Sequence, residues 1–410
     1  MKVLVLAGAC SQIVLLKQLK ERGMTTILAD NNENAVARPY ADKFVKVDLL
    51  NIDAVRAVAK ENNVDLVLSV CADQVLITAA KVSEDLGLPC YIDYQTACNV
   101  SDKGYMKETF ERCGIPTSKH IFISQLDPSK ISGMSYPLVV KPADAYSSKG
   151  VRKATDYSEL EVFFAEAAKI SRSGLVIVEE FNEGAELTVD FQIVDGKAVF
   201  LTASNTEKVN YQDRFLAFRT RNPAAVSDET IERIKVIGQK IADAFALKNS
   251  PMLVQLITDG KKESVLEFCA RTGGGAKYLL VKMATGFDPI TAVLDITLGK
   301  KVCVDEIKSE SKYITNEFLY SYPGVFDHLE GFEELKNEGI IAEYWQFKNK
   351  GARISNAATS SDRVASITIQ ADSFDELVQK HNIAASRIKA INENGEDSLR
   401  HDLLTDIKKL

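Results

Sequence analysis

Several features that define familiar protein classes are missing from this chain of 410 residues. Its seven cysteines are odd in number and scattered, and none forms a CxxC pair, which excludes a disulfide framework and indicates a reducing compartment. Four histidines are too few and too dispersed for a histidine-rich metal site. No apolar run approaches the roughly 18 residues of a membrane-spanning helix, and no signal peptide precedes the first predicted strand. We therefore expect a cytoplasmic protein with no membrane partner.

An excess of positive charge is also absent. The formal net charge is -7 and the pI is about 5.4. Because no face is obviously basic, nucleic acid is not expected as a partner, although a local basic pocket for phosphates remains compatible with these totals. Hydrophobic residues make up 46% of the chain and charged residues 26%, which is ordinary for a globular protein of two to three domains.

Two glycine-rich nucleotide motifs are missing as well. The turn after the first predicted strand reads GACSQI, with one glycine where the dinucleotide-binding fingerprint needs three. The loop at 144–151 holds one glycine and is not a Walker A motif. Gly8, Asp30 and the turn at 71–73 therefore either line one side of a substrate cleft or serve as plain turn residues.

Residues 1–98 show an alternation of predicted strands and helices. Nearly all residues of these strands are apolar, which predicts an α/β domain with a parallel sheet covered on both faces. The predicted strands are residues 2–7, 25–29, 44–47, 66–70 and 90–92, and the predicted helices are 12–22, 52–62 and 75–86.

Lysines and a small-residue loop mark the next region. A helix predicted over 101–114 carries Lys103 and Lys107 on one face, and the strand YPLVVKP ends with Lys141. The following loop, 144–151, is either an ordinary hairpin with solvated lysines or a flap whose N–H and hydroxyl groups cover phosphate oxygens.

The stretch VIVEEFNEGAELTVD at 176–190 predicts two strands joined by a polar turn. Its three carboxylates at the turn are either a solvated charged surface or hydrogen-bond acceptors in a cleft. A polar segment at 205–223, predicted to be irregular, follows, then a helix over 227–245 and a hairpin ending LEFCARTGGG. Consecutive glycines allow close backbone approach to a ligand, or else simply precede a helix.

The ordered set of these pieces resembles the ATP-grasp family over residues 1 to about 300. The resemblance implies an α/β N-terminal parallel-sheet domain (1–98), α+β ATP-grasp lobes (99–300, with a flap lobe at about 117–180) and a small α+β C-terminal module (301–410). The last part is similar to the C-terminal module of L-amino-acid ligases.

This resemblance also implies roles for particular side chains. Phosphate contacts are expected from two lysines and the flap, namely Lys103, Lys141, Ser147, Ser148 and Gly150. The adenosine end is expected to be held by Glu179, the Phe181 backbone and Glu186, with Glu180 beside them. Glu267 and Gln255 would bind Mg²⁺ (or Mn²⁺), and Arg271 would act near the γ-phosphate together with Lys141 and Glu267. Substrate contacts are expected from Arg214, Arg219, Arg221, Gly273 and Gly274.

Two positions depart from the family pattern. Gln255 stands where an acid is usual, and Cys269 stands where asparagine is frequent. An amide carbonyl can coordinate magnesium, but a thiol is a poor ligand for so hard an ion. The number of metal ions is therefore left open.

The implied activity is ATP-dependent ligation, in which a carboxylate is activated as an acyl phosphate and then coupled to an amine, releasing ADP and phosphate. The alternatives are chemistry like that of carbamoyl-phosphate synthetase or of purine-pathway ligases, or a catalytically weak module that binds nucleotide. Amino-acid-like substrates and a homodimer are expected.

Overall fold

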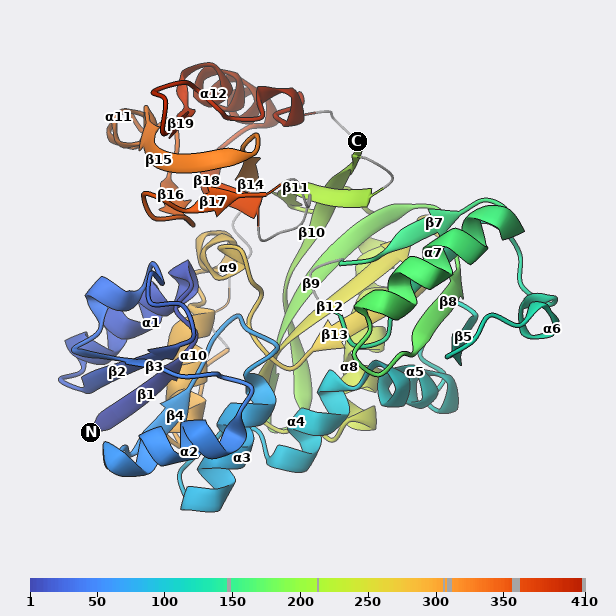
Figure 1. The fold of residues 1–410 in the computed structure, drawn as a ribbon, viewed down its shortest axis with the longest axis horizontal. Helices are drawn as coiled ribbons and strands as arrows, with labels where there is room; N and C mark the ends of the chain where they lie inside the picture. The colour runs from blue at the N-terminus through green and yellow to red at the C-terminus, as the bar shows by residue number, and fades with distance from the viewer. Residues whose placement is uncertain (146–148, 212–213, 305–306, 308–311, 356–361, 408–410) are drawn as a thin grey trace.

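The structure is a computed structural model that describes residues 1–145, 149–211, 214–304, 307, 312–355 and 362–407. Within those ranges, no helix combines the length and the apolar composition needed to cross a bilayer. Three parts are visible in Figure 1: a blue N-terminal domain, a green and yellow middle region, and an orange to red C-terminal part.

The N-terminal domain is built on a parallel sheet with the strand order β3-β2-β1-β4, as the alternating pattern predicted. Its strands are β1 (Lys2–Leu6), β2 (Thr25–Asp30), β3 (Lys43–Lys46) and β4 (Leu66–Leu68). The helical segments of this region are α1 (Cys10–Glu21), η1 (Arg38–Tyr40), α2 (Ile52–Glu61), α3 (Leu76–Leu86) and α4 (Tyr94–Ser101). The strand predicted at 90–92 is wrong, because this short apolar segment packs as a loop instead of joining the sheet edge.

The helix predicted over 101–114 is interrupted at its start. Asp102 ends α4 and is the N-cap of α5 (Lys103–Arg112), because its carboxylate accepts hydrogen bonds from the N–H groups of Gly104 at 2.8 Å and Tyr105 at 3.0 Å. The cap starts a new helix and places Lys103 in its first turn.

The flap lobe contains an antiparallel sheet with the order β5-β8-β6-β7. Its strands are β5 (His120–Ile123), β6 (Leu138–Pro142), β7 (Arg152–Ala154) and β8 (Val176–Glu180). Helix α7 (Tyr157–Ile170) covers one face through Leu160, Phe164 and Ala167, and α6 (Pro128–Ile131) lies at one end (Figure 1).

A larger sheet of eight strands has the order β13-β12-β9-β10-β11-β14-β18-β16. Its strands are β9 (Ala185–Val194), β10 (Lys197–Tyr211), β11 (Arg214–Asn222), β12 (Ser250–Thr258), β13 (Glu263–Cys269), β14 (Tyr313–Tyr320), β16 (Glu343–Gln346) and β18 (Arg363–Ala371). The prediction that 205–223 is irregular is wrong. Residues 205–211 form the last part of β10 and residues 214–222 form β11, and the two strands pair with each other.

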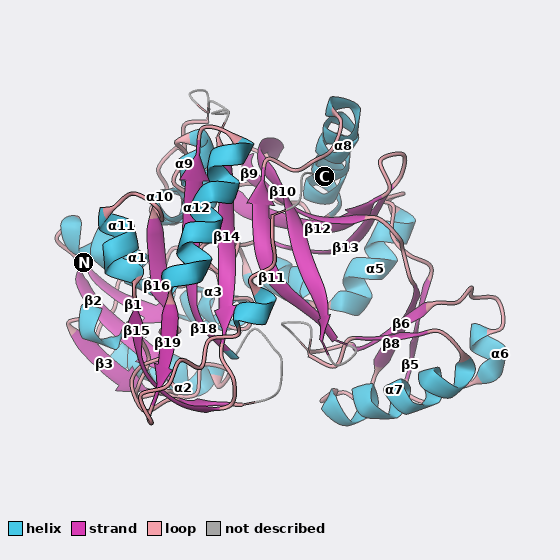
Figure 2. Ribbon diagram, turned by 90° about the horizontal axis from the view of Figure 1, so that it is seen from above, coloured by secondary structure: helices cyan, strands magenta, loops and turns pink. Residues whose placement is uncertain are grey.

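The eight-stranded sheet continues past residue 300. Strand β11 pairs with β14, so strands of the predicted C-terminal module extend the sheet of the ATP-grasp region (Figure 2). A further sheet, β17-β15-β19, and helical segments complete the described residues of the C-terminal part. These elements are β15 (Gly324–Glu330), α11 (Phe332–Asn337), β17 (Arg353–Ile354), α12 (Phe374–Arg387), β19 (Lys389–Asn392) and η3 (His401–Leu403).

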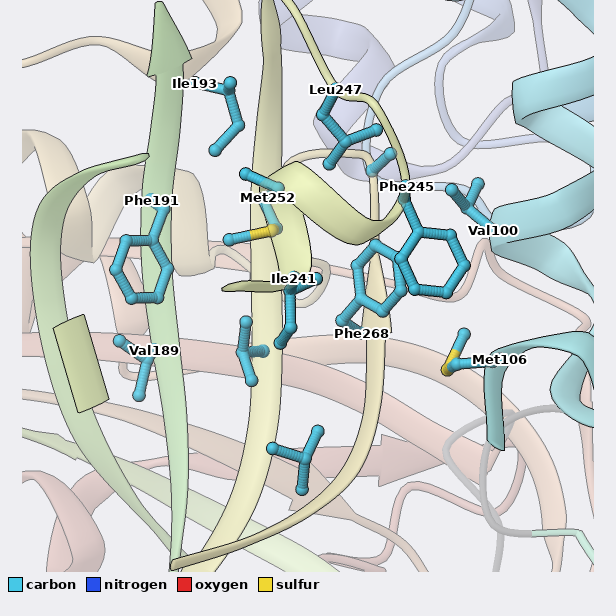
Figure 3. Close-up of a cluster of buried hydrophobic side chains, with 14 of the residues drawn as sticks. Val100, Met106, Val189, Phe191, Ile193, Ile241, Phe245, Leu247, Met252 and Phe268 are labelled. Atoms are coloured by element: carbon cyan, nitrogen blue, oxygen red, sulfur yellow. The ribbon is translucent and has the colours of Figure 1, made fainter. Parts of the chain in front are cut away.

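The core of the middle region lies between the large sheet and α8 (Asp228–Ala244), with α4 and α5 beside it (Figure 3). The rings of Phe245 and Phe268 meet edge to face at 4.6 Å between centroids. Helices α9 (Lys277–Thr285) and α10 (Pro289–Thr297) lie between the N-terminal domain and the large sheet. Ile290 and Val293 share a core with Leu15, and Leu280 packs with Ile314 of β14.

The two antiparallel sheets are joined by residues 181–184. Strand β8 belongs to the flap lobe and β9 to the large sheet, so the stretch 176–190 passes from one sheet to the other and is not a surface hairpin. Gly184 has φ of 137°, and a Cβ built on it would lie 2.3 Å from the carbonyl oxygen of Thr258. The close approach of two backbones requires glycine here.

Candidate active site

A cleft lies where the flap lobe faces the large sheet. The residues that line it come from both sheets and from the start of α5, and they are Lys103, Ser118, Val139, Lys141, Pro142, Ala145, Lys149, Val151, Glu179, Glu180, Phe181, Asn182, Glu186, Lys208, Phe215, Gln255, Ile257, Leu266 and Glu267. Segments that are more than 160 positions apart in the chain, such as Lys103 and Glu267, therefore meet in one cavity.

Most of the residues predicted to bind ATP, and the two predicted to bind magnesium, lie in this lining. Lys103, Lys141, Glu179, Glu180, Phe181, Glu186, Gln255 and Glu267 are all among them. Gly150 lies between two lining residues, Lys149 and Val151, while Ser147 and Ser148 lie outside the described residues. The fold thus brings together what the sequence showed only as separate pieces.

Glu179 is a buried carboxylate, 2% exposed, between two lysines. It forms an ion pair with Lys141, and its Oε2 lies 3.4 Å from Nζ of Lys107. Burial alone would raise the pKa of Glu179, but the positive charges of Lys141 and Lys107 outweigh it and lower the pKa to about 2. Burial also lowers the pKa of Lys107, to about 8, against the opposing effect of Glu179.

The neighbouring Glu180 and Phe181 have backbone and side-chain partners of their own. Glu180 accepts a hydrogen bond from the N–H of Ser135 at 2.9 Å. The N–H of Phe181 donates to the carbonyl of Pro137 at 2.9 Å, so a bond from this backbone to a base edge would use the Phe181 carbonyl oxygen. The Phe181 ring stacks on Phe215 at 6.4 Å between centroids.

Glu186 faces a lysine that the sequence did not single out as a site residue. Its carboxylate lies 2.6 Å from Nζ of Lys208, which belongs to β10 and also lines the cleft. The sequence did not indicate Lys208 and Phe215 as site residues, because the polar pattern of 205–223 predicts an irregular segment. A search for alternating side chains in TEKVNY could have found the strand and placed Lys208 on one of its faces.

Glu267 and Gln255 sit opposite each other on adjacent strands. They are register partners in the β12–β13 ladder, and both line the cleft. Oε2 of Glu267 lies 3.4 Å from Nζ of Lys103, and this lysine is the main cause of a lowered pKa at Glu267. The carboxylate is therefore ionised at neutral pH.

These two side chains fit a magnesium ion that is shared with phosphates, and not a site built from protein ligands alone. Within the described ranges there is no cluster of three or more His, Cys, Asp or Glu residues that could hold a metal. Mg²⁺ commonly takes one or two carboxylates and completes its shell with water and phosphate oxygens, which one carboxylate and one amide carbonyl allow. Burial raises the pKa of the Cys269 thiol well above its usual value, and a soft thiol is a poor ligand for so hard an ion as magnesium.

Arg271 lies beyond the end of β13 and is held by the N-terminal domain. Its Nε is 2.6 Å from Oδ1 of Asp73 and its Nη2 is 2.5 Å from Oδ2, so the two groups form a bidentate pair. Asp73 follows β4, in the turn at 71–73 that the sequence left open between cleft and turn roles. Asp30, in contrast, accepts from the N–H groups of Gly8 and Asn32 and serves its own turn.

The arginines predicted to bind substrate lie elsewhere. Arg219 is fully buried and pairs with Glu207 at 2.8 Å and Glu317 at 3.3 Å, and Arg221 is 5% exposed and shares Glu207. The prediction of substrate contact is therefore wrong for these two, because internal carboxylates already use their guanidinium groups. Arg214 begins β11, and its side chain lies outside the described residues.

Gly273 occurs in tight surroundings close to Arg271, whereas Gly274 has room for an ordinary contact. A Cβ on Gly273 would lie 2.6 Å from Cγ of Lys277, whose Nζ is 3.2 Å from Asp190. Gly274 faces the carbonyl oxygen of Cys71, at 3.6 Å from the position of a Cβ. The glycine loop at 273–275 thus runs between the large sheet and the N-terminal domain.

Family models match two parts of the chain. The model for the D-Ala–D-Ala ligase C-terminus matches residues 110–258, and the ATP-grasp N-terminal domain matches residues 18–90. A D-alanine–D-alanine ligase of Aromatoleum aromaticum is 28% identical over 193 residues, which cover 46% of this chain and 62% of that protein. A phosphoribosylamine–glycine ligase of Methanopyrus kandleri is 24% identical over 391 residues, covering 87% and 85%.

A longer relative is matched only in part. The mitochondrial carbamoyl-phosphate synthase of Aquarana catesbeiana is 22% identical over 304 residues, which are 70% of this chain but 19% of that protein. The chain therefore spans less than two thirds of the length of this synthase and of the D-alanine–D-alanine ligase.

Solved structures share the whole fold. The L-amino acid ligase of Bacillus licheniformis superposes with a TM-score of 0.81 at 22% identity, covering 96% of this chain and 99% of that one. The phosphoribosylglycinamide synthetase of Anaerococcus prevotii gives a TM-score of 0.76 at 21% identity, with coverage of 96% and 99%. These likenesses show a shared fold, and the two family models show that the chain contains ATP-grasp domains, matched over residues 18–90 and 110–258.

Proposed function

We propose that the chain is an ATP-dependent ligase that joins a carboxylate to an amine and releases ADP and phosphate. The observation that carries the proposal is the convergence, in one cleft, of Lys103, Lys141, Glu186 and Glu267, with Arg271 held beyond the strand that carries Glu267. Cations for phosphates, an acid for ribose hydroxyls and an acid for magnesium are the parts that phosphoryl transfer from ATP requires.

In this proposal the γ-phosphoryl group passes from ATP to an oxygen of the substrate carboxylate, and the bond to ADP breaks. The amine then attacks the acyl carbon of the acyl phosphate, loses a proton, and phosphate departs. Lys103 and Lys141 hold the phosphates, while Arg271 lies where it can neutralise charge that develops on the transferred group. Bound by Glu267 and the Gln255 carbonyl, Mg²⁺ would neutralise phosphate charge.

The flap lobe provides the cover for this reaction. Lys149 and Val151 from the 144–151 loop already line the cleft, and Gly150 between them has φ of 76°, with Pro142 and Ile170 packed within 3 Å of where a Cβ would lie. Closure over bound ATP would exclude water, which would otherwise hydrolyse an acyl phosphate.

A screen for ADP release tests the activity. Purified protein is incubated with ATP, Mg²⁺ and pairs of amino acids or small carboxylates, and products are identified by mass spectrometry. Substrate-dependent ADP release with a mass equal to that of the two substrates less water supports the proposal. Glu267→Gln is expected to lower kcat about 100-fold, since a charge that stabilises the transition state is removed. Glu393→Gln, on an exposed turn of the C-terminal part, is the matched control and should behave as wild type.

A catalytically weak nucleotide-binding module is the second possibility, and Gln255 and Cys269 are the residues that favour it. Tight ATP binding without turnover across the whole panel would establish it and reject the ligase. Gln255→Glu sharpens the test: a large gain in rate would show that the natural metal site is impaired, and an unchanged or lower rate would show that the amide is suited to the reaction.

A further inference from the structure

The glycine loop at 273–275 touches the C-terminal part as well as the other two parts of the molecule. Gly275 has φ of 61°, and a Cβ on it would lie 2.7 Å from the ring of Phe318 and 3.7 Å from Nη1 of Arg363. Phe318 is on β14 and Arg363 on β18, both beyond residue 300. The loop that follows Arg271 therefore has an arginine of the C-terminal part beside it.

Arg363 is held in place by neutral partners. Its guanidinium carbon lies 3.6 Å from the centroid of the Phe318 ring, its Nε donates to the hydroxyl of Tyr320 at 2.9 Å, and its Nη2 donates to the carbonyl of Ala217 at 3.2 Å. These contacts set the plane of the guanidinium and direct Nη1 toward Gly275.

The charge of Arg363 is what distinguishes it from its neighbours. Arg219 and Arg221 pair with Glu207, and Arg271 pairs with Asp73. Arg363 forms no ion pair with any carboxylate in the described part of the chain, although it is half-buried. A fixed, half-buried guanidinium without a countercharge is costly unless a ligand provides the anion.

We propose that Arg363 binds a substrate carboxylate that does not react, so that the amine substrate is one that carries its own carboxylate, as an amino acid or a peptide does. This inference rests on the proposed ligase function. Arg271, four residues after Glu267, serves the reacting end, whereas Gly275 lies farther along the loop and has Arg363 of β18 beside it. A guanidinium recognises carboxylates through directed N–H groups, which gives position as well as charge.

Equilibrium binding in the presence of ADP and Mg²⁺ tests the inference without requiring turnover. The probes are the amino acids of the screen, each compared with its primary amide, which has the same shape but no anion, and phosphoethanolamine, which has an amine and a phosphate but no carboxylate. Wild type should bind the preferred amino acid about 10- to 100-fold more tightly than its amide. Arg363→Ala should abolish that preference and leave ADP affinity unchanged.

Two further variants separate binding from structure. Arg363→Lys keeps the charge and should retain part of the preference for the acid. Arg363→Gln keeps polar contacts without the charge and should lose that preference. The order should follow the charge at residue 363 and not the melting temperatures of the variants. Arg353→Ala removes an exposed arginine of the same part of the chain and should change nothing.

The inference is overturned if wild type does not distinguish acid from amide, if Arg363→Ala and Arg363→Gln both keep the full preference, or if phosphoethanolamine is preferred to every amino acid. Its failure is distinct from failure of the ligase. No ADP release with any pair would reject the ligase, while an acid preference that depends on Arg363 could still be measured. Turnover by Arg363→Ala with unaltered preference would reject only the inference.

Discussion

At the scale of single residues, charges in the cleft and beside it lie in pairs or triads, and the Glu179 group is the most deeply buried of them. Glu179 is enclosed by Lys141 and Lys107, Glu186 by Lys208, and Arg271 by Asp73. Removing one member of such a group leaves its partner buried without a countercharge, which costs more than the pair itself contributes. Substitutions that remove a single charge are therefore the sharpest tests at this scale.

Glu179→Gln should lower the free energy of unfolding by about 3–5 kcal/mol at neutral pH, because two lysines lose their buried countercharge. The pKa of Glu179 is lowered to about 2 from an ordinary 4.5, so its contribution is present above about pH 4.5 and is lost as the pH falls toward 2. Denaturant unfolding from pH 7 to pH 3 should show a constant difference between wild type and variant above about pH 4.5, and a shrinking one below it.

Glu180→Gln is the control for this experiment, since Glu180 is the next residue on the same strand and is partly exposed. It should cost less than about 1 kcal/mol. Equal losses from the two variants would contradict the buried triad.

Asp73→Asn should reduce kcat roughly 10- to 100-fold with little change in the KM for ATP, because Arg271 loses the partner that sets its position while the nucleotide cleft is untouched. Asp73 is a positioning residue, since it acts through Arg271. Asp73→Glu keeps the carboxylate and should retain part of the rate that Asp73→Asn loses. Asp65→Asn, at an exposed site of the same domain, is the matched control and should leave the rate unchanged. A raised KM for ATP with normal kcat would argue against this role.

At the scale of elements, the junctions between strands determine where the cleft residues point. The turn at 181–184 carries the chain from the flap sheet to the large sheet, and the β10–β11 pair brings Lys208 and Phe215 over the cleft. Neither junction contains a long apolar run. The turn at 181–184 depends on the backbone geometry of Gly184, and the β10–β11 pair depends on the ion pairs of Arg219 and Arg221 with Glu207.

Gly184→Ala should be strongly destabilising and should weaken ATP binding, because its Cβ would collide with the Thr258 carbonyl at 2.3 Å and push the two sheets apart. Gly174→Ala is the matched control: Gly174 also has a positive φ, of 73°, but nothing lies within 4 Å of the added carbon. It should cost only about 1–2 kcal/mol for the left-handed backbone. Thermal unfolding and ATP titration of both variants provide the comparison, and similar behaviour would show that crowding at Gly184 is unimportant.

Arg219→Ala should lower the free energy of unfolding by about 3–5 kcal/mol, since Glu207 and Glu317 lose a fully buried partner. Chemical denaturation measures this loss, and the KM values of any folded fraction should stay near those of wild type. A stable variant with a selectively raised KM for one substrate would instead return Arg219 to the substrate site.

The sequence predicts those parts of the structure that are buried through apolar side chains better than those that are buried through ion pairs. The parallel strands of residues 1–98 and the hairpin ending EFCAR were predictable because their burial is apolar and leaves a periodic pattern. The strand at 214–222 was not, because Arg219 and Arg221 are buried by ion pairing, which a pattern of apolar residues does not record. Lys208, Phe215 and Arg363 were not predicted as site residues, and the turn that holds Asp73 was left open between two roles, because a single sequence does not show partners that lie far away in the chain.

At the scale of the whole molecule, the three predicted domains share structural parts. The large sheet continues from β11 into β14, the glycine loop at 273–275 touches Cys71, Asp190 and Phe318, and α9 and α10 pack on the N-terminal domain. The boundary at residue 300 stays a prediction from sequence, and the continuous sheet argues that the C-terminal part is needed for the rest to fold.

A chain that ends at residue 300 should therefore be insoluble or should unfold at a much lower temperature than the full chain. It would lack the strand that covers β11 and the carboxylate of Glu317 that pairs with Arg219, leaving an open sheet edge. Circular dichroism and size-exclusion chromatography of both proteins decide the matter. A soluble, cooperative fragment that binds ATP would show that residues 301–410 are an independent module.

The pairing of β11 with β14 also affects the folding of the chain during its synthesis. Strand β11 is complete at Asn222, but its neighbour begins at Tyr313, about 90 residues later. At the usual pace of synthesis, about 5–20 residues per second, the edge of β11 waits roughly 5–20 seconds for its partner. Throughout that interval Arg219 lacks Glu317 and shares the carboxylate of Glu207 with Arg221, so an excess of positive charge on the open strand opposes the stacking of one nascent chain upon another.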